Sequence, residues 1–243
     1  MSAENVKPYN LEEGKKQQIE RMFDQIAPKY DFLNHLLSLG VDVWWRKKAI
    51  SFLKKSEPKT ILDVATGTAD LALETMRQVS PEKIIGLDIS NEMLDIGRKK
   101  IESAGFSNKI SLETGDSENL RFADETFDAV TAAFGVRNFE HLEKGLSEMR
   151  RVLKTGGSVV ILEFSRPQMF PFKQLYFAYF RFVLPVVGRL TSKDPRAYNY
   201  LFESSLAFPQ GQDFIDILIK IGFQSPLSKR LSLGICSIYF AQK

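Results

Sequence analysis

The chain has 243 residues, of which 44% are hydrophobic and 26% charged, so it can build the full core of an ordinary globular protein. A net charge of +3 argues against a nucleic-acid-binding face, and the single cysteine, Cys236, excludes an internal disulfide and a cysteine-based metal cluster. The polar amino terminus lacks a signal-peptide core and no apolar run is long enough to span a bilayer, so we expect a cytoplasmic protein without a metal site.

The amino-terminal quarter, residues 1–57, is predicted to be a helical cover. Residues 1–14 are expected to form a flexible arm. Over 17–53, apolar residues recur at steps of three and four, which predicts short amphipathic helices. Pro28 and Gly40 are expected to separate these helices.

A regular alternation of strand-like and helix-like segments follows, over residues 58–165. Apolar runs predict strands at 60–64, 83–88, 109–114, 127–134 and 157–164. Helical patterns lie between them near 69–78, 91–104 and 141–153. Such alternation predicts a mostly parallel α/β sheet with right-handed crossovers, and we take this segment as the cofactor-binding core.

The alternation stops after residue 165. Residues 166–209 are rich in Phe, Tyr, Leu and Pro and are predicted to form an insert. The final part, 210–243, is predicted to hold one helix and two strands. Because the strands expected at 225–232 and 234–241 are connected only at Leu233–Gly234, they should form an antiparallel hairpin. The fold class is therefore a single Rossmann-like α/β domain that closes in a hairpin.

The segment ILDVATGTAD at 61–70, followed by IIGLDIS at 84–90, has the layout of a nucleotide site. A strand ends in a small-residue turn around Gly67, and a second strand ends at Asp88, about 20 positions later. There a carboxylate can accept hydrogen bonds from ribose hydroxyls. The alternative is a tight strand-to-helix turn without a ligand.

This turn is poor in glycine. A pyrophosphate needs a second glycine where the backbone meets it, and the turn has threonine and alanine instead. A nucleoside without phosphates, such as S-adenosylmethionine, is therefore favoured. Its positive sulfonium also tolerates the nearby Asp63 and Asp70. An NAD(P)-dependent oxidoreductase is the alternative from another class.

Asp116 and Ser117 follow the third predicted strand, at the same edge of the sheet. The Asp116 carboxylate can accept from an adenine amino group, and the Ser117 amide can donate to the ring. An Asx-turn in a surface loop is the alternative. Three loops converging on one edge favour the binding site.

The chain resembles the C-methyltransferase family of menaquinone and ubiquinone biosynthesis along nearly its whole length. The matching segments are MFDQIAPKYDFLNHLLSLGVDVWWR at 22–46, DVATGTAD at 63–70, GDSENLRF at 115–122, FGVRNF at 134–139, RVLKTGGSVVILEFS at 151–165 and YNYLFESSLAFP at 198–209. The first, fourth and sixth are particular to the family. The resemblance implies a class I S-adenosylmethionine-dependent fold with cofactor contacts at Thr68, Asp88, Asp116 and Ser117.

Two departures from the family pattern concern the cofactor site. The family usually has a second small residue and a glycine around the turn, where this chain has Thr66 and Ala69. Ala69 is therefore expected to avoid a positive φ, or else to be strained. Some relatives have a cofactor-binding serine where this chain has Ala133, so we assign no contact there.

The resemblance also implies methyl transfer to a ring carbon of a prenylated naphthohydroquinone, 2-demethylmenaquinol. The ring carbon becomes nucleophilic when a neighbouring hydroxyl, with a pKa of about 10, ionises. Arg137 is predicted to stabilise this anion and Asn138 to orient it. Asp70 is the predicted proton acceptor and Tyr30 an orienting hydroxyl. The alternatives are a surface salt bridge for Arg137 and a core aromatic for Tyr30.

The apolar run at 169–190 is interrupted by Lys173, Arg181, Pro185 and Arg189. It could lie peripherally on the inner face of a membrane, form a lid over the prenyl tail, or form a homodimer surface. Core packing is the remaining alternative. A prenyl tail needs an apolar route, which favours a lid or a transient membrane contact.

Other functions stay open at this point. The family also methylates the ubiquinone precursor 2-polyprenyl-6-methoxy-1,4-benzoquinol, and a methyltransferase of another lipid or phenol is a second alternative. A non-catalytic scaffold is a third. His35 is expected to pack among leucines without a catalytic partner.

Overall fold

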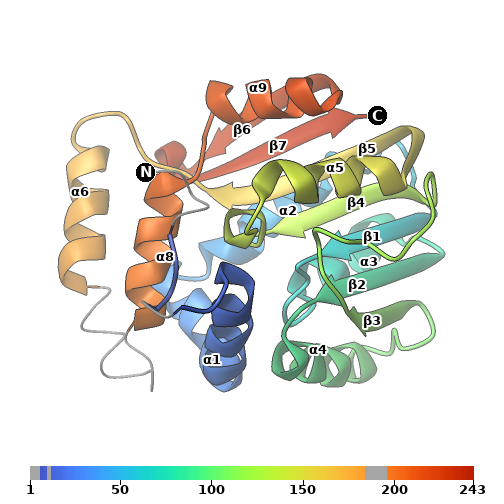
Figure 1. Cartoon of the computed structure of the whole chain (residues 1–243), viewed down its shortest axis with the longest axis horizontal. Coiled ribbons are helices and arrows are strands. Elements are labelled where there is room, and N and C mark those ends of the chain that lie inside the picture. Colours follow the sequence, from blue (N-terminus) through green and yellow to red (C-terminus); the bar gives the residue numbers. More distant parts are fainter. Residues whose placement is uncertain (1–5, 10–11, 184–195) are drawn as a thin grey trace.

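The computed structural model describes residues 6–9, 12–183 and 196–243. At its centre is a seven-stranded sheet with the order β3-β2-β1-β4-β5-β7-β6 (Figure 1). The strands are β1 Thr60–Val64, β2 Lys83–Asp88, β3 Ile110–Thr114, β4 Phe127–Ala133, β5 Leu153–Phe164, β6 Gln224–Leu231 and β7 Cys236–Gln242. β1 to β5 pair in parallel, whereas β7 is antiparallel to both β5 and β6. The predicted mostly parallel sheet with a closing hairpin is thus confirmed.

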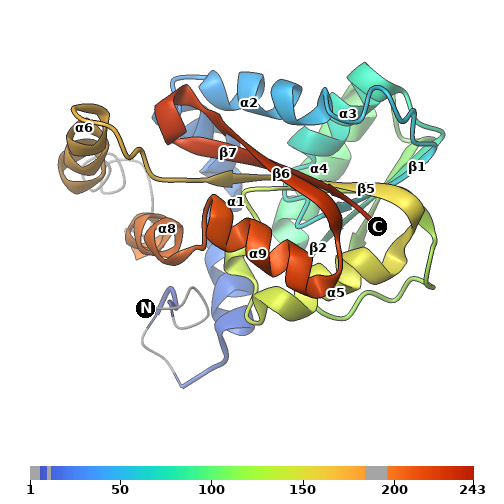
Figure 2. The ribbon, with the colours of Figure 1, turned by 90° about the horizontal axis from the view of Figure 1, so that it is seen from above.

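Helices cover both faces of the sheet. The described helices are α1 Lys15–Leu37, α2 Val41–Ile50, α3 Asp70–Val79, α4 Asn91–Ser103, α5 Leu142–Val152, α6 Phe172–Ala178, α8 Arg196–Ala207 and α9 Gln212–Ile221. Short turns of other helix types are η2 Val136–Asn138, η3 Tyr179–Val183 and η4 Ser232–Gly234. Figure 2 shows α2 and α3 on one face of the sheet and α5 and α9 on the other. Within the described ranges, no helix combines the length and apolar character needed to cross a bilayer.

The central strands are apolar at successive positions because both of their faces are buried. Ile61 and Leu62 are each 0% exposed, yet they belong to two different cores. Ile61 packs with residues of α2 and α3, and Leu62 packs with residues of α5 and α9. A parallel sheet covered on both faces produces this continuous pattern.

The amino-terminal cover differs from the prediction in its first helix. α1 runs unbroken for 23 residues with Pro28 inside it, so the predicted break at Pro28 is wrong. Proline removes one backbone donor, but α1 is held by tertiary packing through buried side chains that precede Pro28, including Met22 and Ala27. The predicted break at Gly40 is confirmed, because Gly40 has a φ of 75° between α1 and α2.

The ends of the cover and the insert are partly described. In the predicted flexible arm, Val6 is only 7% exposed and packs with Ile19 and Met22 of α1. The predicted insert contains α6, η3 and α8, and Figure 1 shows α6 and α8 side by side next to α1. Residues 184–195 of the insert, with two of its interrupting residues, lie outside the described ranges.

Candidate functional site

Two adjoining cavities lie at the carboxyl edge of the sheet, beneath the cover. The smaller has a volume of about 60 Å³ and the larger about 490 Å³. They share the lining residues Phe23, Tyr30 and Phe134. Helix α1 contributes residues to both, so the position of α1 determines the shape of the site.

The smaller cavity brings together most of the predicted cofactor residues. Its lining includes Gly67, Asp88, Asp116 and Ser117, and also Asn138 from η2. These residues come from the carboxyl ends of four different strands, β1 to β4, or from the segments that follow them. The topology therefore joins segments that are up to 71 positions apart, as expected for the carboxyl edge of a parallel sheet.

Asp88 presents a buried carboxylate to this cavity. It is 8% exposed, and it accepts hydrogen bonds from the amides of Gly67 at 2.8 Å and Ser90 at 3.0 Å. Burial raises the pKa of Asp88, and these backbone donors oppose the shift. Ser90, rather than Asp88, caps α4, since its hydroxyl accepts from the Met93 amide at 3.2 Å. Each Asp88 oxygen can still accept a further hydrogen bond.

Asp63 supports the turn from behind instead of lining either cavity. It is 1% exposed, and its two oxygens accept from the hydroxyls of Thr66 at 2.5 Å and Thr131 at 2.6 Å. Burial raises the pKa of the Asp63 carboxyl to about 6, although the two hydroxyls oppose the shift. Its contacts favour a role in fixing the turn over direct contact with a ligand.

The backbone at this edge is strained. Positive φ values occur at Ala65 (52°), Gly67 (55°), Ala69 (65°) and Phe134 (58°). The expectation that Ala69 avoids a positive φ is therefore wrong, and the alternative of strain holds. A non-glycine residue in this region costs about 1–2 kcal/mol. The loops also approach closely, because a Cβ added to Gly135 would lie 2.4 Å from the Ala65 Cβ.

Asp116 has two kinds of partner. One oxygen accepts from the Glu118 amide at 2.9 Å, so the Asx-turn considered as an alternative does form. The other pairs with Lys16 of α1 at 2.5 Å. Asp116 thus forms the Asx-turn and also lines the smaller cavity. Its partner Lys16 is a site residue that the sequence analysis did not identify.

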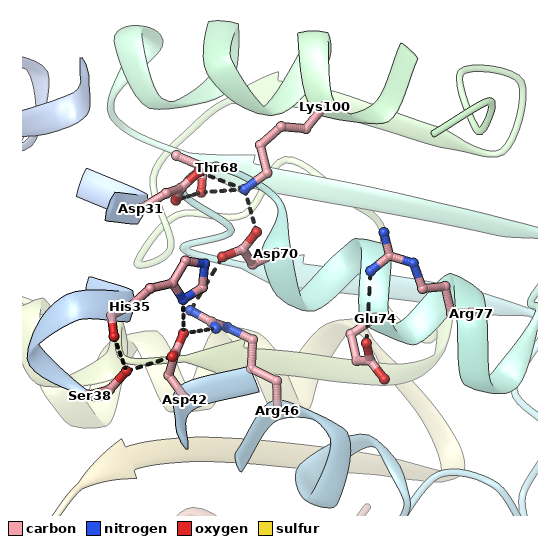
Figure 3. A network of polar contacts seen from close by, with 10 residues as sticks. All are labelled: Asp31, His35, Ser38, Asp42, Arg46, Thr68, Asp70, Glu74, Arg77 and Lys100. Atoms are coloured by element: carbon pink, nitrogen blue, oxygen red, sulfur yellow. Dashed lines mark hydrogen bonds and ion pairs between the residues drawn. The ribbon is translucent and has the colours of Figure 1, made fainter. Parts of the chain in front are cut away.

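Thr68 and Asp70 line neither cavity and instead face a network of ion pairs (Figure 3). The Thr68 hydroxyl donates to Asp31 of α1 at 2.5 Å. Asp70 pairs with Lys100 of α4 and lies 3.5 Å from the Arg46 guanidinium. Lys100 also pairs with Asp31 at 2.8 Å, so it joins α1 to α3. These contacts attach the cover to the core.

The network continues into α2 through Asp42. This carboxylate is 3% exposed and lies 2.5 Å from Arg46 and 2.7 Å from His35 Nδ1 (Figure 3). Burial acts to raise the pKa of Asp42, but hydrogen bonds from Ser38 and His35 and a nearby guanidinium lower it overall. The contact of His35 with a carboxylate is one that the sequence analysis did not predict. The spacing of Asp42 and Arg46, four apart on one helix, was a usable sequence signal.

Arg137 lies in the wall of the larger cavity. It is 5% exposed and pairs at 3.0 Å with Glu163, which is 0% exposed, so the alternative of a surface salt bridge is wrong. Its guanidinium carbon lies 5.4 Å from the centre of the Phe164 ring. Its Nε is buried without a hydrogen-bond partner. A buried, unpaired donor beside a cavity points to a ligand that would accept from it.

Two tyrosines lie near Arg137. Tyr30 lines both cavities, and burial raises its pKa, which the charge of Arg137 and a hydrogen bond with Asn34 oppose. The Tyr200 hydroxyl of α8 donates to Asn138 Oδ1 at 3.1 Å. Asn138 is thereby oriented by the insert. Glu163 and Tyr200 are further site residues that the sequence analysis did not identify. Glu163 could have been found, because it is an acid within the apolar run of β5.

The larger cavity is mainly apolar, and its walls come from the cover, the insert, η4 and the ends of β4 and β5 with η2. The lining residues are Met22, Phe23, Ile26, Tyr30, Asn34, Ser38, Leu39, Val41, Asp42, Trp45, Arg46, Phe134, Arg137, Phe164, Phe172, Leu175, Tyr176, Tyr179, Ala197, Tyr200, Leu201, Ser232, Leu233 and Ile235. In the part of the chain that the structure describes, no group of three or more His, Cys, Asp or Glu side chains could hold a metal ion.

Comparison with known families and relatives gives a consistent result. The model of the ubiE/COQ5 methyltransferase family matches residues 11–243. A demethylmenaquinone methyltransferase of Bacteroides fragilis is 51% identical over 99% of this chain and 98% of the relative. A demethylmenaquinone methyltransferase of Porphyromonas gingivalis is 46% identical over 100% of this chain and 99% of the relative. The ubiquinone/menaquinone biosynthesis C-methyltransferase UbiE of Geobacter sulfurreducens is 46% identical over 97% and 91%.

Solved structures of low identity share the fold. A putative S-adenosyl-L-methionine-dependent methyltransferase of Methanococcus maripaludis has a TM-score of 0.67 at 19% identity, covering 96% of this chain and 97% of that one. A SAM-dependent methyltransferase of Thermotoga maritima has a TM-score of 0.64 at 18% identity, covering 92% and 99%. The predicted class I methyltransferase fold is therefore confirmed.

Replacing Lys100 by methionine should loosen the cover. Asp31 and Asp70 would lose their shared cation and repel each other, which should lower the free energy of unfolding by about 1–2 kcal/mol. Urea denaturation measures this. Lys99→Met is the matched control, since Lys99 is an exposed neighbour on the same helix that forms no ion pair with the described residues. Equal losses in the two variants would contradict a role of Lys100 in attaching the cover.

Proposed function

This chain belongs to the ubiE/COQ5 methyltransferase family, and we propose that it transfers a methyl group from S-adenosyl-L-methionine to a ring carbon of 2-demethylmenaquinol. The product would be menaquinol, at the final step of menaquinone biosynthesis. The names of the Bacteroides and Porphyromonas relatives support this substrate. The observation that carries the mechanism is the buried, unpaired Nε of Arg137 beside the apolar cavity.

The residues around the smaller cavity fit S-adenosylmethionine. Its vicinal ribose hydroxyls match the two Asp88 oxygens, which retain acceptor capacity. We propose that Asp116 and Ser117 contact the adenine and that Gly67 lets the backbone approach the ligand. S-adenosylmethionine has no phosphate group, so the carboxylates gathered around this cavity would not repel it. When bound, the cofactor supplies an electrophilic methyl group.

Thr68 and Asp63 hold this site from outside the cavity. Thr68 joins the turn to the cover through Asp31, and Asp63 joins it to β4 through Thr131. We therefore propose that both residues shape the cofactor turn without touching the nucleoside.

The larger cavity suits a prenylated bicyclic ring. Its volume of about 490 Å³ lies within the range of small-molecule sites, about 300–1,000 Å³. Phe23, Tyr30 and Phe134 stand where the two cavities meet, so a ring bound there would lie next to the cofactor. An apolar wall suits the isoprenoid tail.

Arg137 is proposed to stabilise the anion of the ring hydroxyl next to the methylated carbon. The ion pair with Glu163 orients the guanidinium, and the free Nε can donate to the oxygen without breaking an existing hydrogen bond. Asn138, oriented by Tyr200, is proposed to contact the same oxygen. Tyr30 is proposed to orient the ring.

The acceptor of the hydroxyl proton was predicted to be Asp70. That residue lies outside both cavities and has two cationic partners, which supports a role in holding the cover. We propose that the O–H bond breaks as water takes the proton, while the electron pair stays on the oxygen that faces Arg137. Once the ring carbon carries the methyl group, its own C–H bond breaks, water takes that proton, and the C–H electron pair restores the aromatic ring as the oxygen regains a proton.

The substrate range of the family leaves one alternative within the same chemistry. Relatives of Geobacter and Geotalea are named ubiquinone/menaquinone biosynthesis C-methyltransferases. Methylation of the benzoquinol precursor of ubiquinone is therefore the second candidate. Assays of wild-type enzyme on both quinols distinguish the two.

Exposed apolar side chains surround the larger cavity. Five of its lining residues are themselves at least 36% exposed: Leu39, Val41, Phe172, Leu175 and Leu233. We call them the apolar rim. They come from the turn between α1 and α2, from the start of α2, from α6 and from η4. An apolar rim around an apolar cavity marks a surface where an apolar substrate could enter.

We propose that the apolar rim touches the inner face of a membrane, from which the prenylated substrate enters. Lys47 of α2, Lys173 of α6 and Arg181 of η3 are exposed, and residues 165–183 contain no acid. Apolar side chains with basic neighbours suit an anionic lipid surface. The lid and the homodimer surface are the competing explanations. The cover and the insert would then receive the substrate, and the core would hold the cofactor, within a single domain.

Asp88→Ala should weaken binding of S-adenosylmethionine. The ribose hydroxyls would lose a charge-assisted partner worth about 1.5–3 kcal/mol, which is about 10-fold or more in affinity. Calorimetric titration measures this, with Asp95→Ala as the control because Asp95 is an exposed acid of α4. An affinity within twofold of wild type would remove Asp88 from the ribose site.

Arg137→Lys should lower kcat by about 10- to 100-fold at saturating cofactor. Lysine keeps the charge but lacks the Nε–H group and the planar fork, so the anion is stabilised less. Steady-state kinetics and calorimetry should show lost turnover with cofactor affinity within twofold. Arg151→Lys is the control, since Arg151 has carboxylate partners but lines neither cavity. A wild-type kcat would exclude the assigned role.

Leu39→Glu with Leu175→Glu should reduce both vesicle binding and activity on a long-tailed substrate. Charge on the apolar rim cannot enter the lipid without a large desolvation cost. Flotation with anionic phospholipid vesicles measures binding, and a tail-less naphthohydroquinone should be methylated nearly normally. Ile219→Glu with Leu227→Glu, two exposed apolar residues of α9 and β6, is the control. Equal losses on both substrates would contradict the membrane contact.

A further inference from the structure

Lys15 is buried in a place that is unfavourable for a cation. It begins α1 and is 0% exposed. The first turn of α1 contains no acid, and the next residue is also a lysine. A helix amino terminus repels positive charge, and removing an ammonium group from water is costly. The contacts of Lys15 must therefore offset both effects.

These contacts are with the turn that carries the proposed catalytic residues. Lys15 Nζ donates to the carbonyl oxygen of Phe139 at 2.8 Å and to that of Arg137 at 3.3 Å. The two carbonyls lie on either side of Asn138. The Lys15 amide donates to Glu140 Oε1 at 2.8 Å. Glu140 thus supplies the negative charge that the first turn of α1 lacks.

The same turn is also held from two other directions. Glu118 Oε1 accepts from the amides of Glu140 at 2.7 Å and His141 at 3.0 Å. The Tyr200 hydroxyl donates to the Asn138 side chain at 3.1 Å. Lys15 is the contribution of the cover to this arrangement, and its neighbour Lys16 reaches Asp116 in the cofactor loop.

We infer that Lys15 is a positioning residue for methyl transfer, which sets the backbone of Arg137 and Asn138 when the cover is docked. The inference rests on the proposed function of these two residues. By holding the carbonyls on both sides of Asn138, the ammonium group fixes the direction in which the two side chains leave the turn. Lys15 does not line either cavity, so it acts through the turn and not on the substrate.

The test compares Lys15→Met with Lys15→Arg and with a matched control. Methionine has a similar length but no donor, whereas arginine can still donate to both carbonyls. The control is Gln18→Met. Gln18 is also 0% exposed and near the start of α1, but its side chain contacts the Glu13 carbonyl at 2.8 Å and the Tyr9 amide at 2.9 Å.

We expect Lys15→Met to lower kcat on 2-demethylmenaquinol at least 10-fold, with KM changed less than threefold. Binding of S-adenosylhomocysteine, measured by calorimetry, should stay within twofold. Lys15→Arg should recover much of the kcat. Gln18→Met should lower the melting temperature about as much as Lys15→Met does, but its kcat should equal that of the wild type. A Lys15→Met kcat within twofold of wild type, or an equal kcat loss in Gln18→Met, would overturn the inference.

A second measurement separates this inference from the proposed function. In ¹⁵N-labelled protein, Lys15→Met should shift the amide resonances of Asn138 and Glu140, whereas Gln18→Met should leave them in place. This readout does not depend on the substrate. If wild-type protein does not methylate 2-demethylmenaquinol, the proposed function fails, while unmoved Asn138 and Glu140 resonances in Lys15→Met would overturn the positioning role itself.

Discussion

The docking of α1 against the carboxyl edge of the sheet is the constraint on which the site depends. Both cavities have α1 residues in their walls, so neither would have its shape without this helix. Hydrophobic burial supplies the bulk of the attachment, and ion pairs set its position. Lys16 reaches the loop after β3 and Asp31 reaches Lys100 of α4. Helix α1 also contacts Thr68 after β1, Ser90 after β2 and Phe139 after β4, so it reaches all the loops around the smaller cavity.

The wall of the larger cavity holds two cations against aromatic rings. Phe134 and Phe164 lie 4.6 Å apart, with the Arg46 guanidinium 5.8 Å from the first ring and that of Arg137 5.4 Å from the second. Each guanidinium also has a carboxylate partner. Ring faces attract cations, and buried charges persist when they are paired. An apolar pocket can therefore keep positive charge ready for a developing anion.

Strain at the cofactor turn is offset by the structure around it. Ala65, Ala69 and Phe134 keep positive φ values because the loops of β1 and β4 meet there at van der Waals distance. The buried Asp63 ties the same turn to β4. Backbone strain that the surrounding structure enforces is common at sites where the backbone must approach a ligand closely. The Ala and Thr residues that depart from the family pattern are thus compatible with a nucleoside site.

The sequence by itself determined the strands, the closing hairpin and the loop positions of Gly67, Asp88 and Asp116, because apolar runs and strand ends are local features that a parallel sheet brings to one edge. Only the tertiary structure decided the rest. Pro28 stays inside a helix because packing outweighs its missing donor, and Ala69 takes a positive φ because its neighbours require it. Asp70 faces Lys100 and Arg46, and Arg137 faces Glu163, since ion-pair partners 24 to 30 positions apart are chosen by how helices and strands pack. The periodicity of the sequence does not show which residues become ion-pair partners, because the pairing depends on contacts between elements that are distant along the chain.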